Sequence, residues 1–340
     1  MRIIIAPPVR QAFFPLDKRW HLGPSVHSPS RAKQVVWLAS LVAYAEASAI
    51  CERIGHFTAP STSIWREVQT YGPQCQAYVQ AQADHTAPER VVLPPAGADT
   101  DDVKGMGVDG GTINIRDEGW KEFKVGTIGT VVVQTERDPD TGDDVERAHT
   151  IDPVCCAVLG SVELFAPHFW RLAVQQGVPS AKDSVLTADG ADWIWNLAAD
   201  YLPDSVQIVD WYHALQHLSQ AANVLYPTDA AAAKRWFDAH TDDLFQGHVT
   251  AIITALKKAN HPEAAHYFET HQRRMRYQEF REDGYPLGSG TVESSIKQFK
   301  FRLAGAGMRW NRSNAEQMLT LRSASLSKTF DTLWANAVLN

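Results

Sequence analysis

The order of strand and helix patterns in the middle of the chain is the feature that most constrains its fold. Three strand patterns come first, and then a helix, a strand, a second helix and a last strand follow. The strand patterns alternate or are short apolar runs, and they cover residues 103–116, 121–134, 145–159, 184–189 and 206–210. Helical spacing covers 162–177 and 191–202. The first three strands therefore pair antiparallel, and each later strand needs a crossover.

These patterns predict an α/β protein with a mixed five-stranded sheet and helices on both faces. Right-handed crossovers place the last two strands parallel to one of the first three. This order fits a ribonuclease-H-like fold. A doubly wound fold would alternate strands and helices from its start, whereas this chain begins with three strands.

Helical patterns lie on both sides of the sheet region. We expect a basic arm over 1–30, a helical segment over 31–80, a linker over 81–102, a catalytic core over 103–213 and 286–326, and a helical insertion over 214–285. In the helical segment, Ser61 or Thr62 can cap a second helix that runs through Val68 to Gly72. Two helices joined by a short turn are typical of a helix-turn-helix, and an ordinary corner between two helices has the same pattern.

Composition excludes several classes of protein. The chain has 340 residues, of which 44% are hydrophobic, so it can bury a sizeable core and is not a disordered chain or a collagen. It contains no run of 18 apolar residues, as a membrane-spanning helix would require. The four cysteines lack C-x-x-C spacing, which favours a reduced, cytoplasmic protein.

Charge is segregated along the chain. The net charge of −7 argues mildly against a nucleic-acid partner. Residues 294–315 nevertheless contain no acid, and acids gather at 97–102, 136–146 and 182–210. This distribution predicts a site that combines a metal with a polyanion, and chance clustering on a solvated surface is the alternative. The candidate DNA-binding residues are Lys297, Lys300, Arg302, Arg309, Arg312 and Arg66.

Three aspartates stand in or at the ends of predicted strands. Asp109 precedes a Gly pair in the first strand, Asp189 ends the fourth, and Asp210 ends the fifth. Ligands gather at the carboxyl ends of parallel strands, and Mg²⁺ prefers oxygen ligands. An aspartate in such a position also often serves only as a helix cap, and this alternative stays open for each residue taken alone.

The helix expected from about Thr291 adds a fourth acid. Its buried stripe comprises Val292, Ile296, Phe299 and Leu303. Glu293 runs beside this stripe, with Lys297 and Lys300 four and seven residues later. We interpret this edge as a metal-binding glutamate beside lysines that contact phosphate. The alternative is an ordinary surface ion pair on a helix.

Four motifs resemble one family of enzymes. They are V-D-G-G at 108–111, L-T-A-D-G-A at 186–191, V-D-W-Y-H at 209–213 and G-S-G-T-V-E-S at 288–294. Together they resemble the DDE transposases of bacterial insertion sequences, and among these the ISKra group, which is related to the Mutator-like superfamily. The resemblance runs from about residue 10 to the last expected helix.

The resemblance implies a function and a set of site residues. It implies a transposase that cleaves DNA and transfers strands, with Asp109, Asp189 and Glu293 as catalytic metal ligands. Two Mg²⁺ or Mn²⁺ ions would be the cofactors. Asp210 and His213 would be accessory residues, with the imidazole contacting DNA or buttressing the site. The partners would be the transposon ends and the target DNA, and the active complex would be a homo-oligomer.

One departure from the family gives a second hypothesis. Relatives commonly carry a cysteine-rich segment at the amino terminus, and F-F-P-L-D at 13–17 resembles the region just after it. We therefore expect a chain that is truncated or starts late. The alternative function is an inactive or truncated transposase-derived DNA-binding protein.

Two other classes of enzyme fit less well. His213 and His217 have H-x-x-x-H spacing, but Ala214 stands where a zinc protease needs glutamate. A glycoside hydrolase would need two carboxylates that flank one bond, and the strand order and the basic clusters disfavour it.

Overall fold

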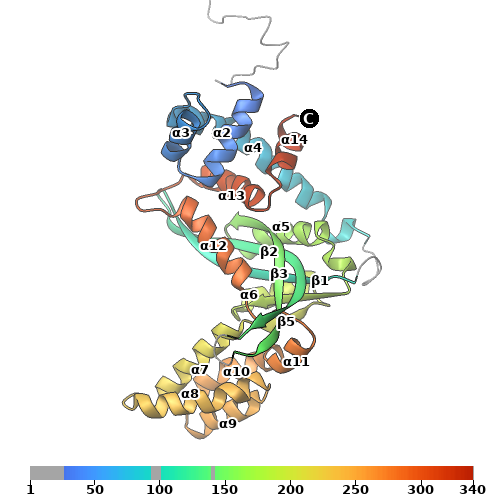
Figure 1. The fold of residues 1–340 in the computed structure, drawn as a ribbon, viewed down its shortest axis with the longest axis vertical. Coiled ribbons are helices and arrows are strands. Elements are labelled where there is room, and N and C mark those ends of the chain that lie inside the picture. The colour runs from blue at the N-terminus through green and yellow to red at the C-terminus, as the bar shows by residue number, and fades with distance from the viewer. Residues whose placement is uncertain (1–26, 93–100, 139–141, 340) are drawn as a thin grey trace, which may run out of the picture.

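A mixed five-stranded sheet lies at the centre of the protein (Figure 1). The computed structural model describes residues 27–92, 101–138 and 142–339. The strands are β1 (Val103–Ile115), β2 (Gly119–Arg137), β3 (Asp144–Leu159), β4 (Asp183–Ala188) and β5 (Val206–Val209). Their order across the sheet is β3-β2-β1-β4-β5, with β1, β2 and β3 antiparallel and with β4 and β5 parallel to β1. The predicted α/β class and mixed sheet are thus confirmed.

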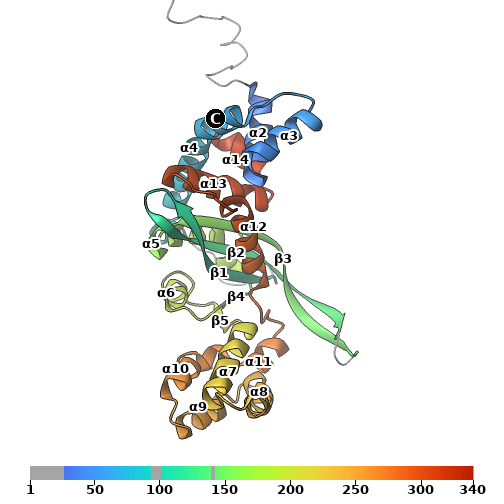
Figure 2. The same cartoon turned by 90° about the vertical axis from the view of Figure 1, so that its left-hand side faces the viewer.

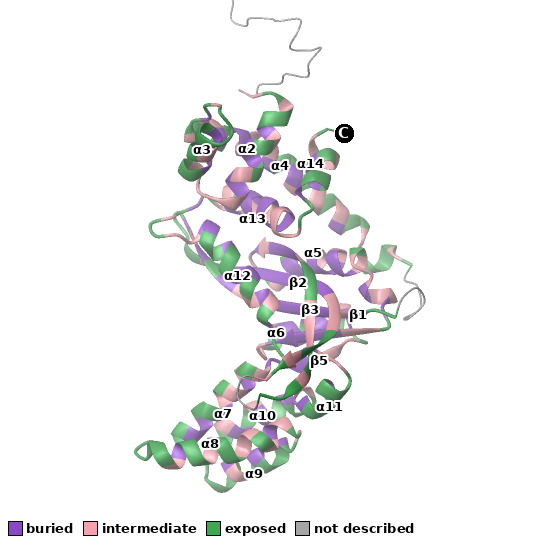
Figure 3. Ribbon diagram, in the orientation of Figure 1, coloured by how far each residue is buried: buried purple, intermediate pink, exposed green. Residues whose placement is uncertain are grey.

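Helices cover both faces of the sheet, and the glycines of the strands show which helix lies on which face. The crossover helix α5 (Val162–Gln175) packs on β2, where Phe169 lies against Gly126. The second crossover helix is α6 (Asp192–Tyr201). On the other face, α12 (Gly290–Leu303) crosses β1, and a Cβ atom at Gly107 would lie 3.0 Å from Val292 Cγ1. The buried middle of the sheet therefore lies between the two sets of helices (Figure 3).

The N-terminal helices pack with the C-terminal ones. These helices are α2 (Pro29–Leu41), α3 (Tyr44–Arg53), α4 (Ser61–His85), α13 (Arg312–Leu326) and α14 (Phe330–Val338). They share one apolar core with α12 and the adjoining face of the sheet. Arg322 ties the two groups together, since its Nη1 donates to the backbone oxygen of Ser40 at 3.1 Å. The 31–80 segment is thus built into the same core as α12.

Several element ends differ from those predicted by the sequence. α4 continues to His85, past Gly72 and Pro73, so the first residues of the expected linker are helical. Two further helices, α13 and α14, follow the one expected as last. Most of the expected basic arm, the 93–100 part of the linker and the tip of the 138–144 turn lie outside the described residues.

The segment between β5 and α12 is built of helices and contains no strand, as the absence of period-2 runs predicts. Its helices are α7 (Trp211–Leu225), α8 (Ala230–Phe245), α9 (Val249–Lys258), α10 (Pro262–His271) and α11 (Tyr277–Glu282). They gather at the end of the molecule opposite α2 and α3 (Figure 2). They do not form a separate body, because one apolar core runs from the sheet through α7 to α11. Tyr277 ties this segment to the sheet by donating to the backbone oxygen of Val209 at 3.0 Å.

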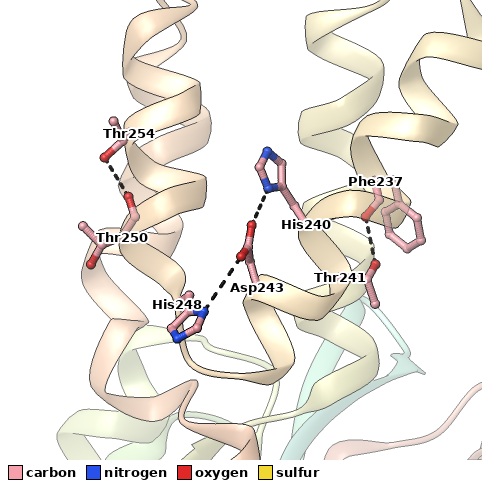
Figure 4. Close-up of polar contacts among 7 residues, drawn as sticks. All are labelled: Phe237, His240, Thr241, Asp243, His248, Thr250 and Thr254. Atoms are coloured by element: carbon pink, nitrogen blue, oxygen red, sulfur yellow. Dashed lines mark hydrogen bonds and ion pairs between the residues drawn. The ribbon is translucent and has the colours of Figure 1, made fainter.

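A polar contact joins two helices of this segment (Figure 4). Asp243 near the end of α8 lies 2.8 Å from Nδ1 of His240 and 3.9 Å from Nδ1 of His248, which precedes α9. The turn between the helices is thus held by a carboxylate between two imidazoles.

Two further observations concern the character of the chain. In the part of the chain that the structure describes, the helices are all too short or too polar to cross a bilayer. The cysteines Cys51, Cys75, Cys155 and Cys156 are buried free thiols. Burial raises the pKa of Cys75 to about 12, which keeps this thiol protonated and unreactive at neutral pH.

Candidate active site

The register of the parallel strands places three aspartates beside one another. The last β1–β4 pair joins Gly107 to Thr187, and the last β4–β5 pair joins Ala188 to Val209. Continuing this register by one or two residues brings Asp109, in the middle of β1, level with Asp189 and Asp210, which directly follow β4 and β5. The three aspartates predicted from the sequence thus lie side by side along the edge that the carboxyl ends of β4 and β5 form.

Helix α12 brings Glu293 over the same edge. Gly107 and Gly111 of β1 both face α12, since Val292 lies against the first and Lys300 Cε would lie 3.3 Å from a Cβ atom of the second. Side chains alternate along a strand, so Asp109 between them points to α12 as well. A larger residue at Gly107 would push α12 away from the sheet, which explains the small residue there.

The pKa of Asp109 shows that the acids interact. Burial of this half-buried carboxyl raises its pKa, and the charges of Asp189 and Glu293 raise it further. The backbone N–H of Gly110, which donates to Oδ1 at 2.6 Å, and the neighbouring His213 lower it. Carboxylates from β1, from the end of β4 and from α12 therefore share one electrostatic environment. Like charges crowded in this way favour a bound cation or a bound proton.

The other two carboxyls have protein partners of their own, one for Asp189 and two for Glu293. Asp189 Oδ1 accepts from the backbone N–H of Ala191 at 3.0 Å. Glu293 Oε1 accepts from the Ser289 hydroxyl at 3.3 Å, and its Oε2 lies 3.9 Å from the ammonium of Lys297. These contacts orient both side chains beside Asp109.

Asp210 caps a helix, which is the alternative left open for each strand-end aspartate. It is completely buried, and its Oδ1 caps α7 by accepting from the backbone N–H of His213 at 2.8 Å. Its Oδ2 accepts from the backbone N–H and the hydroxyl of Ser289 at 2.6 and 2.9 Å. Asp210 therefore links the starts of two helices: one of its oxygens caps α7, and the other positions the start of α12, which carries Glu293.

Aromatic and imidazole groups form one wall of this region. The rings of His217 and Tyr267 stack at 3.6 Å, and Tyr267 comes from α10 in the helical segment. Burial and the neighbouring His213 lower the pKa of His217 against the opposing effect of Asp189. Gly190, at φ +105°, lets this wall approach, because a Cβ atom there would lie 3.3 Å from the Tyr267 hydroxyl. Nothing local in the sequence marks Tyr267, which lies 78 residues after Asp189.

The donor set fits a hard divalent cation. Asp109, Asp189 and Glu293 supply carboxylate oxygens, the ligand type that Mg²⁺ and Mn²⁺ take. Over the described residues, no group of three Asp, Glu, His or Cys side chains is arranged to hold one ion. The three carboxylates are thus neighbours within reach of each other's charge, rather than a set assembled at ligand distances.

The predicted DNA-binding residues divide into two groups. Lys297, Lys300, Arg309 and Arg66 are exposed. Arg302, by contrast, is only 2% exposed, and its Nε donates to the backbone oxygen of Ala39 at 2.7 Å. The side chain of Arg302 thus packs inside the protein and does not lie with the two lysines on the exposed edge of α12. Arg312 is held by Glu118, which accepts from its Nε at 3.0 Å.

Comparison with known proteins gives no family for this chain. No protein-family model matches it, and no curated protein matches it in sequence.

Proposed function

We propose that the chain is a DDE transposase with a ribonuclease-H-like core. Its reaction would be metal-dependent phosphoryl transfer on DNA, as strand cleavage and strand transfer of an insertion sequence. One observation carries the proposal: β1, the end of β4 and α12 bring Asp109, Asp189 and Glu293 together, close enough for their charges to interact. These acids come from three elements that are far apart in the sequence, and each belongs to one of the motifs that resemble the DDE transposases.

Each residue near the carboxylates has a part in this proposal. Asp109, Asp189 and Glu293 would hold Mg²⁺ or Mn²⁺, which when bound activates the attacking oxygen and stabilises the leaving oxygen. Asp210 holds the start of α12 in place through Ser289. His213 is close enough for its charge to lower the pKa of Asp109, and it would offer an imidazole to a phosphate or to a water molecule.

The basic side chains on α12 would guide the substrate. Lys297 and Lys300 are exposed on the same helix as Glu293, and Lys300 lies over Gly111 of β1. Ammonium groups in this position neutralise DNA phosphates without reading sequence. The substrate strand would therefore run along α12 past the carboxylates.

A plasmid-nicking assay tests the proposal without knowledge of the transposon ends. Supercoiled DNA is incubated with the protein and Mg²⁺ or Mn²⁺, and conversion to the relaxed form is measured. Asp109→Asn, Asp189→Asn and Glu293→Gln should each slow nicking by at least about 100-fold, since a lost metal ligand removes several kcal/mol of transition-state stabilisation. Asp204→Asn, at an exposed turn before β5, is the matched control and should nick normally.

The same assay separates the two hypotheses for function. Nicking that depends on all three acids supports the transposase. Binding of DNA by the wild-type protein with no nicking in either metal would contradict it, and would instead support a transposase-derived DNA-binding protein without catalysis.

A further inference from the structure

A pocket of about 850 Å³ opens at the far end of α12 from Glu293. Its walls come from the α2–α3 junction at Tyr44, from Trp65 of α4, from Arg116 after β1 and from the loop that follows α12. Glu293 and Arg302 are nine residues apart on α12, which corresponds to about 13 Å along the helix axis. Figure 1 shows the loop after α12 beside the β1–β2 turn, near α3.

The floor of the pocket is fixed by backbone hydrogen bonds. The N–H of Arg116 donates to the Trp310 oxygen at 2.8 Å, and the N–H of Trp310 donates to the Asn114 oxygen at 3.0 Å. The indole N–H of Trp310 donates to the Leu303 oxygen at 2.8 Å. The loop after α12 is thus tied both to β1 and to the end of its own helix, so the pocket is formed before any ligand arrives.

Three cations line this pocket against a single acid. The cations are Arg116, Arg302 and Arg309, and the acid is Asp117. Arg116 and Arg309 form no ion pair with any described residue. The pocket therefore has a net positive charge and suits an anionic ligand.

The side chain of Arg302 indicates which kind of ligand this pocket binds. Although Arg302 is 98% buried, its Nη2 has no hydrogen-bond partner among the described residues. A buried N–H without a partner costs free energy, so such groups are rare in folded proteins. An anion oxygen in the pocket would satisfy this donor with a charge-assisted hydrogen bond.

Trp65 adds a second requirement. Its indole is 43% exposed at the pocket, which leaves a large flat ring open to solvent. Asn311 and Asn314 line the same pocket, and their amides both donate and accept hydrogen bonds. A phosphate alone would not need an aromatic ring. A nucleotide with an unstacked base needs a ring for the base, a cation for the phosphate and amides for the base edge.

We propose that this pocket binds one unpaired nucleotide of a DNA strand. The base stacks on Trp65, and the phosphate is held by Arg116, Arg309 and the unpartnered Nη2 of Arg302. The exposed Lys297 and Lys300 lie on α12 between this pocket and Glu293, so they continue the same basic track. The choice of DNA rather than a free nucleotide rests on the proposed function.

Binding measured in EDTA tests the pocket without cleavage. The probes are a 20-base-pair duplex with a three-nucleotide 3′ overhang that contains 2-aminopurine, and the same duplex with blunt ends. The wild-type protein should bind the overhang probe roughly 5- to 100-fold more tightly and quench its fluorescence, because base–aromatic stacking has about this effect. Trp65→Ala should abolish the preference and the quenching, and Trp65→Phe should restore part of both.

Matched variants separate stacking from folding. Arg309→Ala should also reduce the preference, through the phosphate contact. Trp37→Ala is the control, because Trp37 is 42% exposed but lies on α2 outside the pocket, and this variant should behave as the wild type. Thermal melting of each variant confirms that it is folded.

The results distinguish failure of the pocket proposal from failure of the proposed function. An overhang preference that survives Trp65→Ala, or a wild-type protein with no preference, would overturn the proposal. Competition by free dAMP as strong as that by the overhang would assign the pocket to a mononucleotide and would also overturn it. A preference for the overhang without Mg²⁺-dependent nicking would contradict the proposed transposase activity but would still support the proposed nucleotide pocket.

Discussion

The two ends of α12 handle charge in opposite ways. At the first turn, Glu293 is half-buried beside Asp109, and the charges of both carboxyls add to a crowded acidic edge. In the last turn, Arg302 is buried between the rings of Tyr44 and Trp310, each centred 5.1 Å from its guanidinium carbon. At the acidic end, crowded carboxylates favour a bound cation. At the basic end, the buried guanidinium of Arg302 favours a bound anion.

This comparison also shows what such charges do for the helix itself. An acid in the first turn and bases in the last turn both interact favourably with the helix dipole. Part of the charge order along α12 thus stabilises the helix whatever the chain does. Function has to be argued from the groups that the dipole does not explain, namely the crowding at Asp109 and the unpartnered Nη2 of Arg302.

The largest effect on stability is expected at Asp210, beneath the acidic end. Asp210→Ala should lower the free energy of unfolding by about 3 kcal/mol or more, because three donors of His213 and Ser289 lose their buried acceptor. Asp189→Ala removes a carboxyl with a single backbone donor and should cost about 1 kcal/mol. Urea unfolding of both variants gives the comparison, and equal losses would show that Asp210 is not the anchor of α12.

The next effect is expected at the basic end. Arg302→Ala should lower the free energy of unfolding by about 2 kcal/mol, through the lost hydrogen bond to Ala39 and the lost packing on two rings. Arg309→Ala, at an exposed site in the same pocket, should change it by less than about 0.5 kcal/mol. A small loss for Arg302→Ala would mean that desolvation of its charge offsets these contacts.

Much of the sheet could be predicted because each strand and crossover helix shows its own local pattern of apolar residues. The five strand patterns and the two crossover helices lie within a few residues of their expected ends. α4 was predicted too short because Gly72 and Pro73 normally end helices. In the folded chain Gly72 instead packs on Gln317 of α13, since a Cβ atom there would lie 3.0 Å from the Gln317 amide oxygen. That contact joins segments 245 residues apart, so no local pattern shows it.

The candidate site was predictable in its residue types but not in its details. Motif position and strand order predict Asp109 on the first strand and Asp189 at the end of the fourth, and the apolar stripe of the last expected helix predicts Glu293 beside it. The anchoring role of Asp210 depends on Ser289, which lies 79 residues later. The burial of Arg302 depends on Ala39 and Tyr44 from the other end of the chain. Such roles come from tertiary contacts between distant segments.

A smaller effect tests the crowding at the acidic end. The pKa of Asp109 is raised in the folded state, so the folded state binds more protons than the unfolded state. The free energy of folding contributed by this group is therefore most favourable below the unfolded pKa of about 3.8. It becomes less favourable as the pH rises from there through the folded pKa. Asp109→Asn should therefore be more stable than the wild type at pH 7 without metal, and its advantage should vanish near pH 3. Thermal melting in EDTA across this range measures it.

Added Mg²⁺ provides the control for that experiment. If the acids hold the ion, Mg²⁺ should raise the melting temperature of the wild type and leave Asp109→Asn nearly unchanged, because a ligand stabilises only the state that binds it. A wild type that is more stable than Asp109→Asn at pH 7 in EDTA would contradict the crowding.

The smallest effects are expected on the exposed edge between the two ends. Lys297→Ala and Lys300→Ala should each change the free energy of unfolding by less than about 0.5 kcal/mol, because both ammonium groups are exposed.

Each of these lysine variants should weaken DNA binding for every sequence and lower the magnitude of the salt slope by about one, since each lysine neutralises about one phosphate. Glu293→Gln should leave DNA binding nearly intact. DNA affinity measured against salt concentration for the three variants gives the answer. If both lysine variants keep the wild-type slope, this edge is only a solvated helix face, and the DNA must reach the acids by another path, along residues 1–44 or 271–281.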